Sequence, residues 1–132
     1  MLKKYIAVAA VFGAIGVALG AFGAHGLKKI TEDEKILHGY QTGVEYQMYH
    51  VFALLAVAFL SEKISNKFLK WSANCFVAGI LLFSGSLYLI TILKIQESSA
   101  VKFAGPITPV GGIFFIAGWV FLFLSVIGKK KL

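Results

Sequence analysis

The feature that most constrains this chain is a set of four mostly apolar segments. A helix that crosses a membrane needs about 20 consecutive, mostly apolar residues. Only 14% of the residues are charged and 58% are hydrophobic, whereas a soluble domain carries about 25% charged residues. We therefore predict an all-α fold with a single transmembrane domain over residues 1–132, whose four spanning helices lie at about 5–24, 44–60, 71–93 and 107–128.

The distribution of lysine decides whether the second segment spans the membrane, because only residues 51–60 of it are free of polar side chains. With four spans, both termini and the middle connection share one side of the membrane. The cytoplasmic side of a membrane protein carries the excess of Lys and Arg, so we predict cytoplasmic termini in a multi-pass protein of the cell membrane (the bacterial inner or plasma membrane). The side with the termini holds eight lysines (Lys3, Lys4, Lys63, Lys67, Lys70, Lys129, Lys130 and Lys131), and the other side holds five (Lys28, Lys29, Lys35, Lys94 and Lys102).

The connection between the first two spans is the most polar part of the chain. Its Thr31–Glu34 segment has the pattern of a capping box, in which a Thr and a Glu three residues apart satisfy the first amides of a helix. We therefore expect a short helix at about 32–40 that lies on the membrane surface. We expect Gly39 and Gly43 to break this helix before the second span begins. The role of residues 28–41 stays open.

Small residues recur along one face of the first span, at Gly79 in the third span and every seven residues in the fourth. In the first span they follow alternating steps of four and three residues, which keeps them on one side of a helix. Such residues let two membrane helices approach closely, and the partner is either a helix of the same chain or another subunit. The helix-packing residues predicted in this way are Gly13, Gly16, Gly20, Gly23, Gly79, Gly111 and Gly118.

Polar side chains gather in what we expect to be the outer half of the bundle. Polar groups within a membrane are costly, and those that are present tend to be functional. Where several helices bring them together, a pocket between helices is expected. We predict a site for a small ligand, a lipid head group or a proton, formed by His25, Glu45, Gln47, His50, Ser84, Ser86, Tyr88 and Thr108.

Several of these residues also have simpler interpretations. His50 and Tyr46 are one helical turn apart and can hydrogen bond to a neighbouring helix, and serines in helices commonly bond back to their own backbone. His25 can cap the first span by donating to its last carbonyls. Glu45 can lie at the solvated membrane surface, although we expect it to point into the bundle and accept hydrogen bonds from His25 or Tyr88. Glu45 and His50 are separated by about 140° around a helix, which disfavours a metal site, and we predict none.

Four motifs together involve all the predicted spans. They are Gly20–Leu27, Thr42–His50, Phe83–Tyr88 and Gly105–Gly112, the last followed by Gly118 and Trp119. In this combination the sequence resembles a family of small bacterial membrane proteins known as domain of unknown function 423, which has relatives in mitochondria. The resemblance implies a four-helix integral membrane protein and brings no established activity, ligand or catalytic residue.

Two classes of function fit these features. The first is a binding or permeation protein with an outward-facing polar pocket, and the second is a structural or accessory subunit that packs with itself or with a larger membrane complex. We expect neither enzymatic activity nor a cofactor, because we find no nucleophile–base pair at helical spacing and no phosphate-binding, haem or iron–sulfur motif. All thirteen basic residues are lysines, which disfavours nucleic-acid recognition and indicates contact with the head groups of the lipid bilayer.

Overall fold

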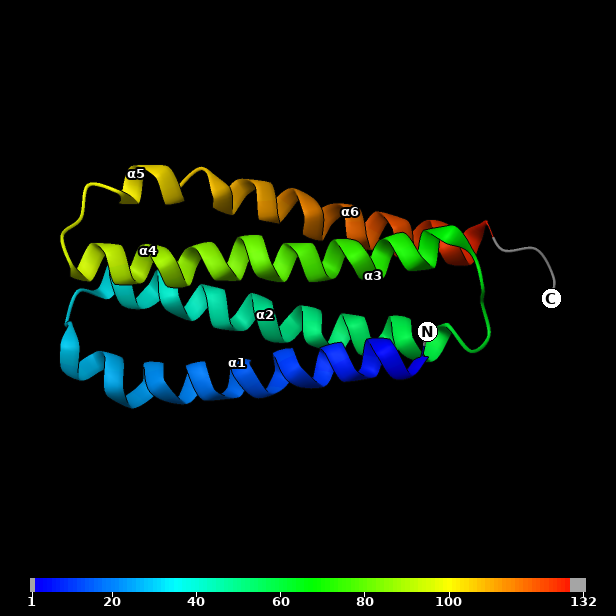
Figure 1. Cartoon of the computed structure of the whole chain (residues 1–132), viewed down its shortest axis with the longest axis horizontal. Helices are drawn as coiled ribbons and strands as arrows, with labels where there is room; N and C mark the ends of the chain where they lie inside the picture. Colours follow the sequence, from blue (N-terminus) through cyan, green and yellow to red (C-terminus); the bar gives the residue numbers. More distant parts are fainter. Residues whose placement is uncertain (1, 129–132) are drawn as a thin grey trace.

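The computed structural model describes residues 2–128, and every regular element in that range is helical (Figure 1). The predicted all-α fold is therefore confirmed. Four rods run along the bundle, and one of them consists of three helical segments joined end to end. The elements are α1 (Leu2–Ile30), α2 (Glu34–Leu60), α3 (Lys67–Gly79), the π-helix η1 (Ile80–Ser84), α4 (Gly85–Ile95), the single turn α5 (Val101–Ala104) and α6 (Ile107–Ile127).

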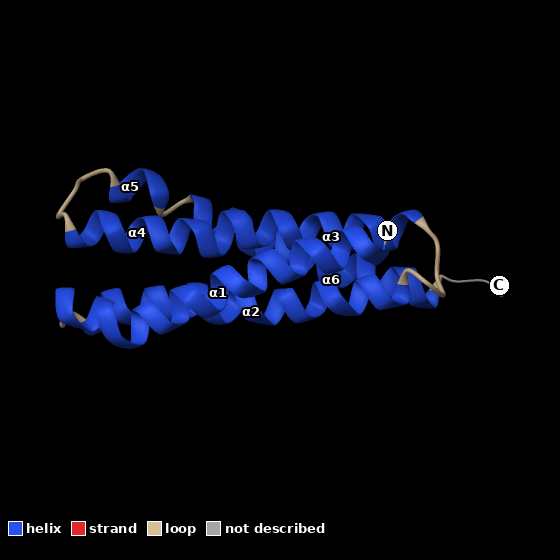
Figure 2. Cartoon of the chain, turned by 60° about the horizontal axis from the view of Figure 1, so that its bottom comes forward, coloured by secondary structure: helices blue, strands red, loops and turns tan. Residues whose placement is uncertain are grey.

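The rods pack in the order α1, α2, α3–η1–α4 and α6 (Figure 1). We call the end with the α1–α2 connection (31–33) and α5 the distal end, and the opposite end, where α1 begins and α6 finishes, the proximal end. α1 packs chiefly on α2, whereas α6 packs on α3 and η1. Toward the distal end α1 separates from α4 (Figure 2).

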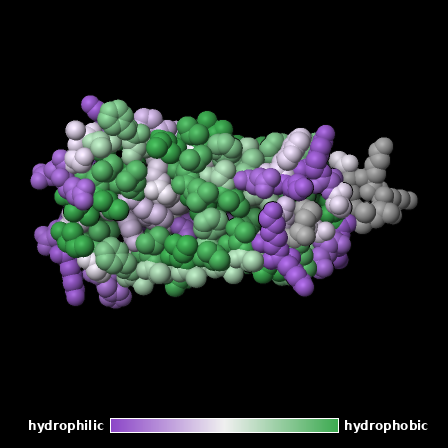
Figure 3. Space-filling view, in the orientation of Figure 1, coloured by the Kyte–Doolittle hydropathy of each residue, from purple (hydrophilic) through white to green (hydrophobic). Residues whose placement is uncertain are grey.

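All four rods are long and apolar enough to cross a membrane. Large hydrophobic side chains point outward from each of them, as Val17, Phe52, Leu81 and Ile116 illustrate. On the face shown in Figure 3, hydrophobic residues predominate in the middle, and hydrophilic ones gather toward the two ends. An apolar belt of this extent needs lipid to cover it, so the four rods are membrane spans, as predicted.

α2 is the central rod, and this explains why its sequence is the hardest to recognise as a span. Its mean hydropathy is the lowest of the four rods and its buried share is the largest. Only a helix that turns its polar side chains toward other helices can combine these two properties within a membrane. Its buried residues include Gln47 and His50 beside the apolar Leu54 and Val57.

The expected surface helix at 32–40 is not a separate element, which corrects the sequence-based boundary. α2 runs without a break from Glu34 to Leu60, and its N-cap is Asp33, whose carboxylate accepts hydrogen bonds from the backbone amides of Lys35 (2.9 Å) and Ile36 (3.4 Å). A glycine within a helix costs only about 1 kcal/mol, which packing can offset. A Cβ atom added at Gly43 would lie 3.2 Å from the Cβ of Leu87, so this glycine lets α4 approach α2.

The third rod is longer than the predicted 71–93 and changes its helical period in the middle. It begins at Lys67, where the side chain of Asn66 accepts a hydrogen bond from the amide of Leu69 at 3.0 Å. A Cβ atom added at Gly111 of α6 would lie 2.6 Å from the Cα of Phe83, which belongs to η1. The π-helical turn therefore lies where two backbones come closest together.

Candidate functional site

Gln47 lies at the junction of three helices, where both the nitrogen and the oxygen of its side-chain amide are hydrogen bonded. Its side chain is only 2% exposed. The Nε2 atom donates to the backbone carbonyl of Phe12 on α1 at 2.7 Å, and Oε1 accepts from the hydroxyl of Tyr88 on α4 at 2.6 Å. A buried amide without partners would be strongly unfavourable, so this geometry connects α1, α2 and α4.

Gly16 makes room for this connection. A Cβ atom at Gly16 would lie 2.5 Å from the sulfur of Met48 and 3.3 Å from Nε2 of Gln47. The absent side chain thus lets α2 come close enough for the Gln47 amide to reach a backbone carbonyl of α1. The other helix-packing glycines predicted from the sequence also face side chains or backbone of another rod in the structure; these are Gly13, Gly20, Gly23, Gly79, Gly111 and Gly118.

Two tyrosines stand next to each other on the distal side of Gln47. The hydroxyl of Tyr40 donates to the backbone carbonyl of Leu19 on α1, and its ring packs where Gly23 carries no side chain. The ring centroids of Tyr40 and Tyr88 are 5.5 Å apart. Sequence analysis identified Tyr88 but not Tyr40, because Tyr40 was assigned to the surface helix.

His50 has both ring nitrogens occupied. Nδ1 lies 2.7 Å from the backbone carbonyl of Tyr46, and Nε2 lies 3.0 Å from the indole nitrogen of Trp119 on α6. An indole N–H can only donate, so Nε2 is the acceptor and Nδ1 carries the proton. The imidazole stacks on Phe115 with 3.6 Å between ring centroids and an angle of 8° between planes. This neutral histidine connects α2 with α6.

Hydroxyl groups of the third rod also form hydrogen bonds to neighbouring helices. Ser84 donates to the backbone carbonyl of Gly43 at 2.7 Å. Ser86 donates to the carbonyl of Phe83 at 2.9 Å and also lies within hydrogen-bonding distance of the Thr108 hydroxyl. Among residues 2–128, every buried side-chain nitrogen or oxygen has a hydrogen-bond partner. The structure therefore brings six of the eight predicted residues into contacts between helices.

Glu45 and His25 lie elsewhere, which corrects the expectation that Glu45 points into the bundle. Both side chains are exposed. Gln41, on the same helix as Glu45, donates to its carboxylate at 3.4 Å, while Nδ1 of His25 is 3.2 Å from the carbonyl of Ala21 on its own helix. Glu45 precedes Gln47 by two positions, about 200° around a helix, so one of the two must face outward when the other faces inward. Within the described part of the chain, no three His, Cys, Asp or Glu side chains approach as a metal site requires.

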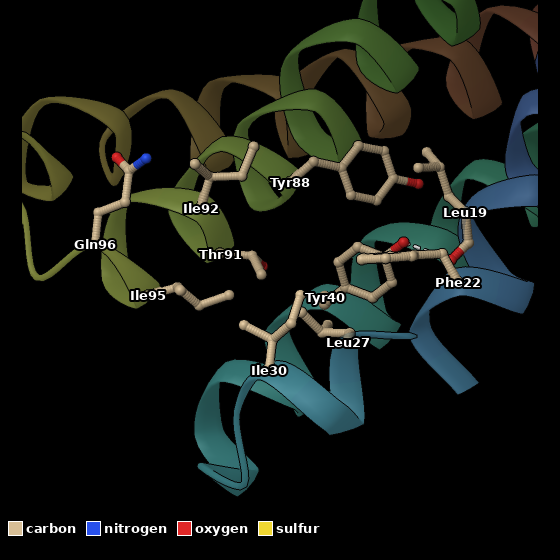
Figure 4. A pocket seen from close by; sticks show the side chains of 10 residues that line it. All are labelled: Leu19, Phe22, Leu27, Ile30, Tyr40, Tyr88, Thr91, Ile92, Ile95 and Gln96. Carbon is tan, nitrogen blue, oxygen red and sulfur yellow. Dashed lines mark hydrogen bonds between the residues drawn. The ribbon is translucent and has the colours of Figure 1, made fainter. Parts of the chain in front are cut away.

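A cleft opens on the distal side of the two tyrosines, where α1 and α4 separate (Figure 4). We call it the tyrosine cleft. Its volume is about 270 Å³, and most of its lining is apolar. The tyrosine rings form one end, while Ile30, Ile95 and Gln96 lie toward the other (Figure 4). The lining residues are Leu19, Phe22, Leu27, Ile30, Tyr40, Tyr88, Thr91, Ile92, Ile95 and Gln96.

Only Tyr88 of this lining was among the predicted site residues. The other side chains are mostly Leu, Ile and Phe, which are abundant on every membrane helix and carry no signal of a site. The one feature that could have indicated a shared location was the presence of Tyr40, Tyr88 and Gln96 toward the distal ends of two spans, once α2 had been recognised as a single helix.

The fold and the cleft together define a small polytopic α-helical membrane protein whose polar residues join its helices and whose open site is apolar. Residues 19–112 match the family described as "Protein of unknown function (DUF423)". This range contains the whole tyrosine cleft as well as Gln47 and His50. The chain belongs to this family, as its motifs indicated.

Bacterial relatives match along nearly the whole chain. A UPF0382 membrane protein of Haemophilus influenzae is 46% identical over 132 residues, which is 100% of both chains. The UPF0382 membrane protein YwdK of Bacillus subtilis is 40% identical over 96% of this chain and 98% of its own. The UPF0382 inner membrane protein YgdD of Escherichia coli is 39% identical over 99% of this chain and 95% of its own. No solved structure matches the chain. The relatives and the four spans confirm a multi-pass protein of the bacterial membrane.

Proposed function

We propose that the protein binds an amphiphile from the membrane in the tyrosine cleft and catalyses no reaction on it. The observation that carries the proposal is the cleft itself, an apolar hollow of about 270 Å³ beside a set of fully hydrogen-bonded polar groups. Sites for small molecules are concave and mostly apolar, with a few polar groups that orient the ligand. The lining of the tyrosine cleft supplies both the apolar surface and a few polar groups.

The positions of the polar groups indicate how such a ligand lies. At the inner end, the hydroxyls of Tyr40 and Tyr88 are already bonded to Leu19 and Gln47, so that end presents aromatic faces to an apolar chain. Gln96 caps the last turn of α4, and its side chain is exposed. The apolar part of the ligand therefore lies along the tyrosine rings, with its polar group near Gln96.

Photolabelling with a single-chain fatty acid that carries a diazirine tests this proposal on the purified protein. We expect the label on α4 around Tyr88–Gln96 and on α1 around Leu19–Ile30. Ile95→Trp places a large ring in the cleft and should remove most of this labelling. Leu89→Trp is the matched control, because Leu89 is 44% exposed on the same helix and does not line the cleft. Equal labelling of both variants would contradict the proposal.

A second candidate function is that of an accessory subunit, and a specific observation on α1 favours it. Besides the glycine face that packs on α2, this helix has a second small face that is exposed, formed by Ala7, Ala10, Ala14 and Ala21. A small face directed outward allows a further helix to approach, from a second copy or from a larger complex. Ala14→Cys should then form disulfide-linked dimers or mixed conjugates in native membranes, whereas Val126→Cys on the exposed surface of α6 should not.

A further inference from the structure

A second cleft lies on the other side of α4, between α2 and the start of α6. We call it the lysine cleft. Its volume is about 330 Å³, and its walls include Ile36 on α2, Leu87 and Ile90 on α4, and Pro109 on α6. Thr91 lines both clefts, so α4 separates them. The lysine cleft is therefore a different site from the tyrosine cleft.

Two cations flank this cleft from different helices. Lys35 lies in the first turn of α2 and Lys94 in the last turn of α4, and both line the cleft. The antiparallel course of the two helices brings these lysines together at the distal end, where the apolar surface gives way to hydrophilic residues (Figure 3). No Asp or Glu is among the residues that line the cleft. An anion at this position therefore meets two positive charges and no lining carboxylate.

Gly39 is the glycine of α2 that borders this cleft. It lines the cleft in the interior of α2, and a Cβ atom added there would meet no other atom within 4 Å. Glycine destabilises a helix interior, and the helix-packing glycines of this protein offset that cost by letting another rod approach. Gly39 has no such neighbour. Because Gly39 has no side chain, the space beside Lys35 stays open.

We propose that the lysine cleft binds an anionic phospholipid, with the phosphate between Lys35 and Lys94 and the first part of an acyl chain against Ile36, Leu87 and Ile90. The apolar walls favour a lipid over free phosphate, because inorganic phosphate would make no use of them. Lysines next to a membrane surface attract anionic lipids, and here the shape of the cleft adds an apolar contact to that attraction.

Native mass spectrometry of the detergent-solubilised protein, mixed with equal amounts of phosphatidylglycerol and phosphatidylcholine that carry the same chains, tests the proposal. We expect about a tenfold preference for phosphatidylglycerol. The double variant Lys35→Gln/Lys94→Gln should bind both lipids equally. Lys102→Gln is the charge control, since this exposed lysine on α5 does not line the cleft.

Gly39→Leu tests the shape of the cleft without a change in charge. It should abolish the bound phosphatidylglycerol while leaving the melting temperature unchanged or higher, because leucine favours a helix more than glycine does. Gly85→Leu is the matched control, since Gly85 also faces open space but lies outside the cleft. Ile95→Trp in the tyrosine cleft should leave the preference intact, so the two proposals fail separately.

Three results would overturn the assignment. The wild-type protein could bind both lipids equally, or the double lysine variant could keep the preference of the wild type. In the third, an excess of inorganic phosphate would displace phosphatidylglycerol, which would identify a site for free phosphate.

Discussion

The hydroxyl of Tyr88 and the side-chain carbonyl of Gln47 lie 2.6 Å apart where α1, α2 and α4 meet. The other end of the same amide reaches the backbone of Phe12 at 2.7 Å. One glutamine thus connects three helices, and it does so at the inner end of the tyrosine cleft. The packing of the bundle and the shape of its open site therefore depend on the same contact.

Gln47→Leu should destabilise the protein by about 1–3 kcal/mol, because it leaves the Tyr88 hydroxyl without a partner in apolar surroundings. Tyr88→Phe should have a smaller effect, since the Gln47 amide keeps its bond to α1. Because the two residues share one hydrogen bond, the double variant should be less destabilised than the sum of the single variants. Unfolding in mixed micelles with increasing dodecyl sulfate measures all three. Strict additivity would show that the bond contributes nothing to stability.

Two adjacent glycines of α6 should respond to alanine in opposite ways. A Cβ atom at Gly111 would lie 2.6 Å from the Cα of Phe83, a backbone atom that cannot turn aside, whereas at Gly112 the nearest contact is 3.9 Å. Overpacking of this kind costs about 1–3 kcal/mol or more, and alanine is the better helix former. We expect Gly111→Ala to lower the melting temperature clearly and Gly112→Ala to leave it unchanged or higher. Similar melting temperatures for the two would refute the close approach of α6 to η1.

The tautomer of His50 is a third prediction. Because Trp119 donates to Nε2, the proton of the neutral ring lies on Nδ1 and is shared with the carbonyl of Tyr46. Nitrogen-15 NMR of histidine-labelled protein should show a protonated Nδ1 and an unprotonated Nε2. Trp119→Phe removes the donor and should shift the Nε2 resonance, while Trp71→Phe, at an indole that packs on Phe68 and Phe121 and not on His50, serves as the control. An Nε2–H signal in the wild type would exclude the Trp119 hydrogen bond.

The membrane architecture follows from local sequence properties, whereas the site does not. Apolar length is enough to predict four spans, and the period of a helix is enough to place the glycines of α1 on one face. The same period shows only that Glu45 and Gln47 lie on opposite faces of α2. The choice between them depends on Gly16 and the Phe12 carbonyl, both on another helix. His50 and Trp119 are 69 residues apart, so no local pattern relates them.

The two clefts could not be predicted from the sequence for a similar reason. Both clefts depend on how far α4 lies from its neighbours at the distal end. Packing contacts along the whole bundle together determine that distance. The residues that line them are ordinary membrane residues apart from the two tyrosines and the two lysines. A glycine next to a polar segment commonly ends a helix, so the sequence predicts a helix break at Gly39. In the structure it is a position where α2 continues and a side chain is absent.

The orientation of the bundle is the last prediction, and we propose that the distal end faces away from the cytoplasm. The proximal side carries eight lysines in the sequence and the distal side five, and a membrane protein keeps its positive excess inside. Three of the eight, Lys129–Lys131, lie outside the described residues. Single cysteines in a Cys75→Ala background test the proposal, at Glu32 for the distal end and at Glu62 for the proximal end, since both side chains are exposed. A membrane-impermeant maleimide should label Glu32→Cys in intact cells and Glu62→Cys only after lysis. The opposite pattern would place the lysine cleft in the cytoplasmic leaflet, and labelling of both variants in intact cells would mean that the chain inserts in two orientations.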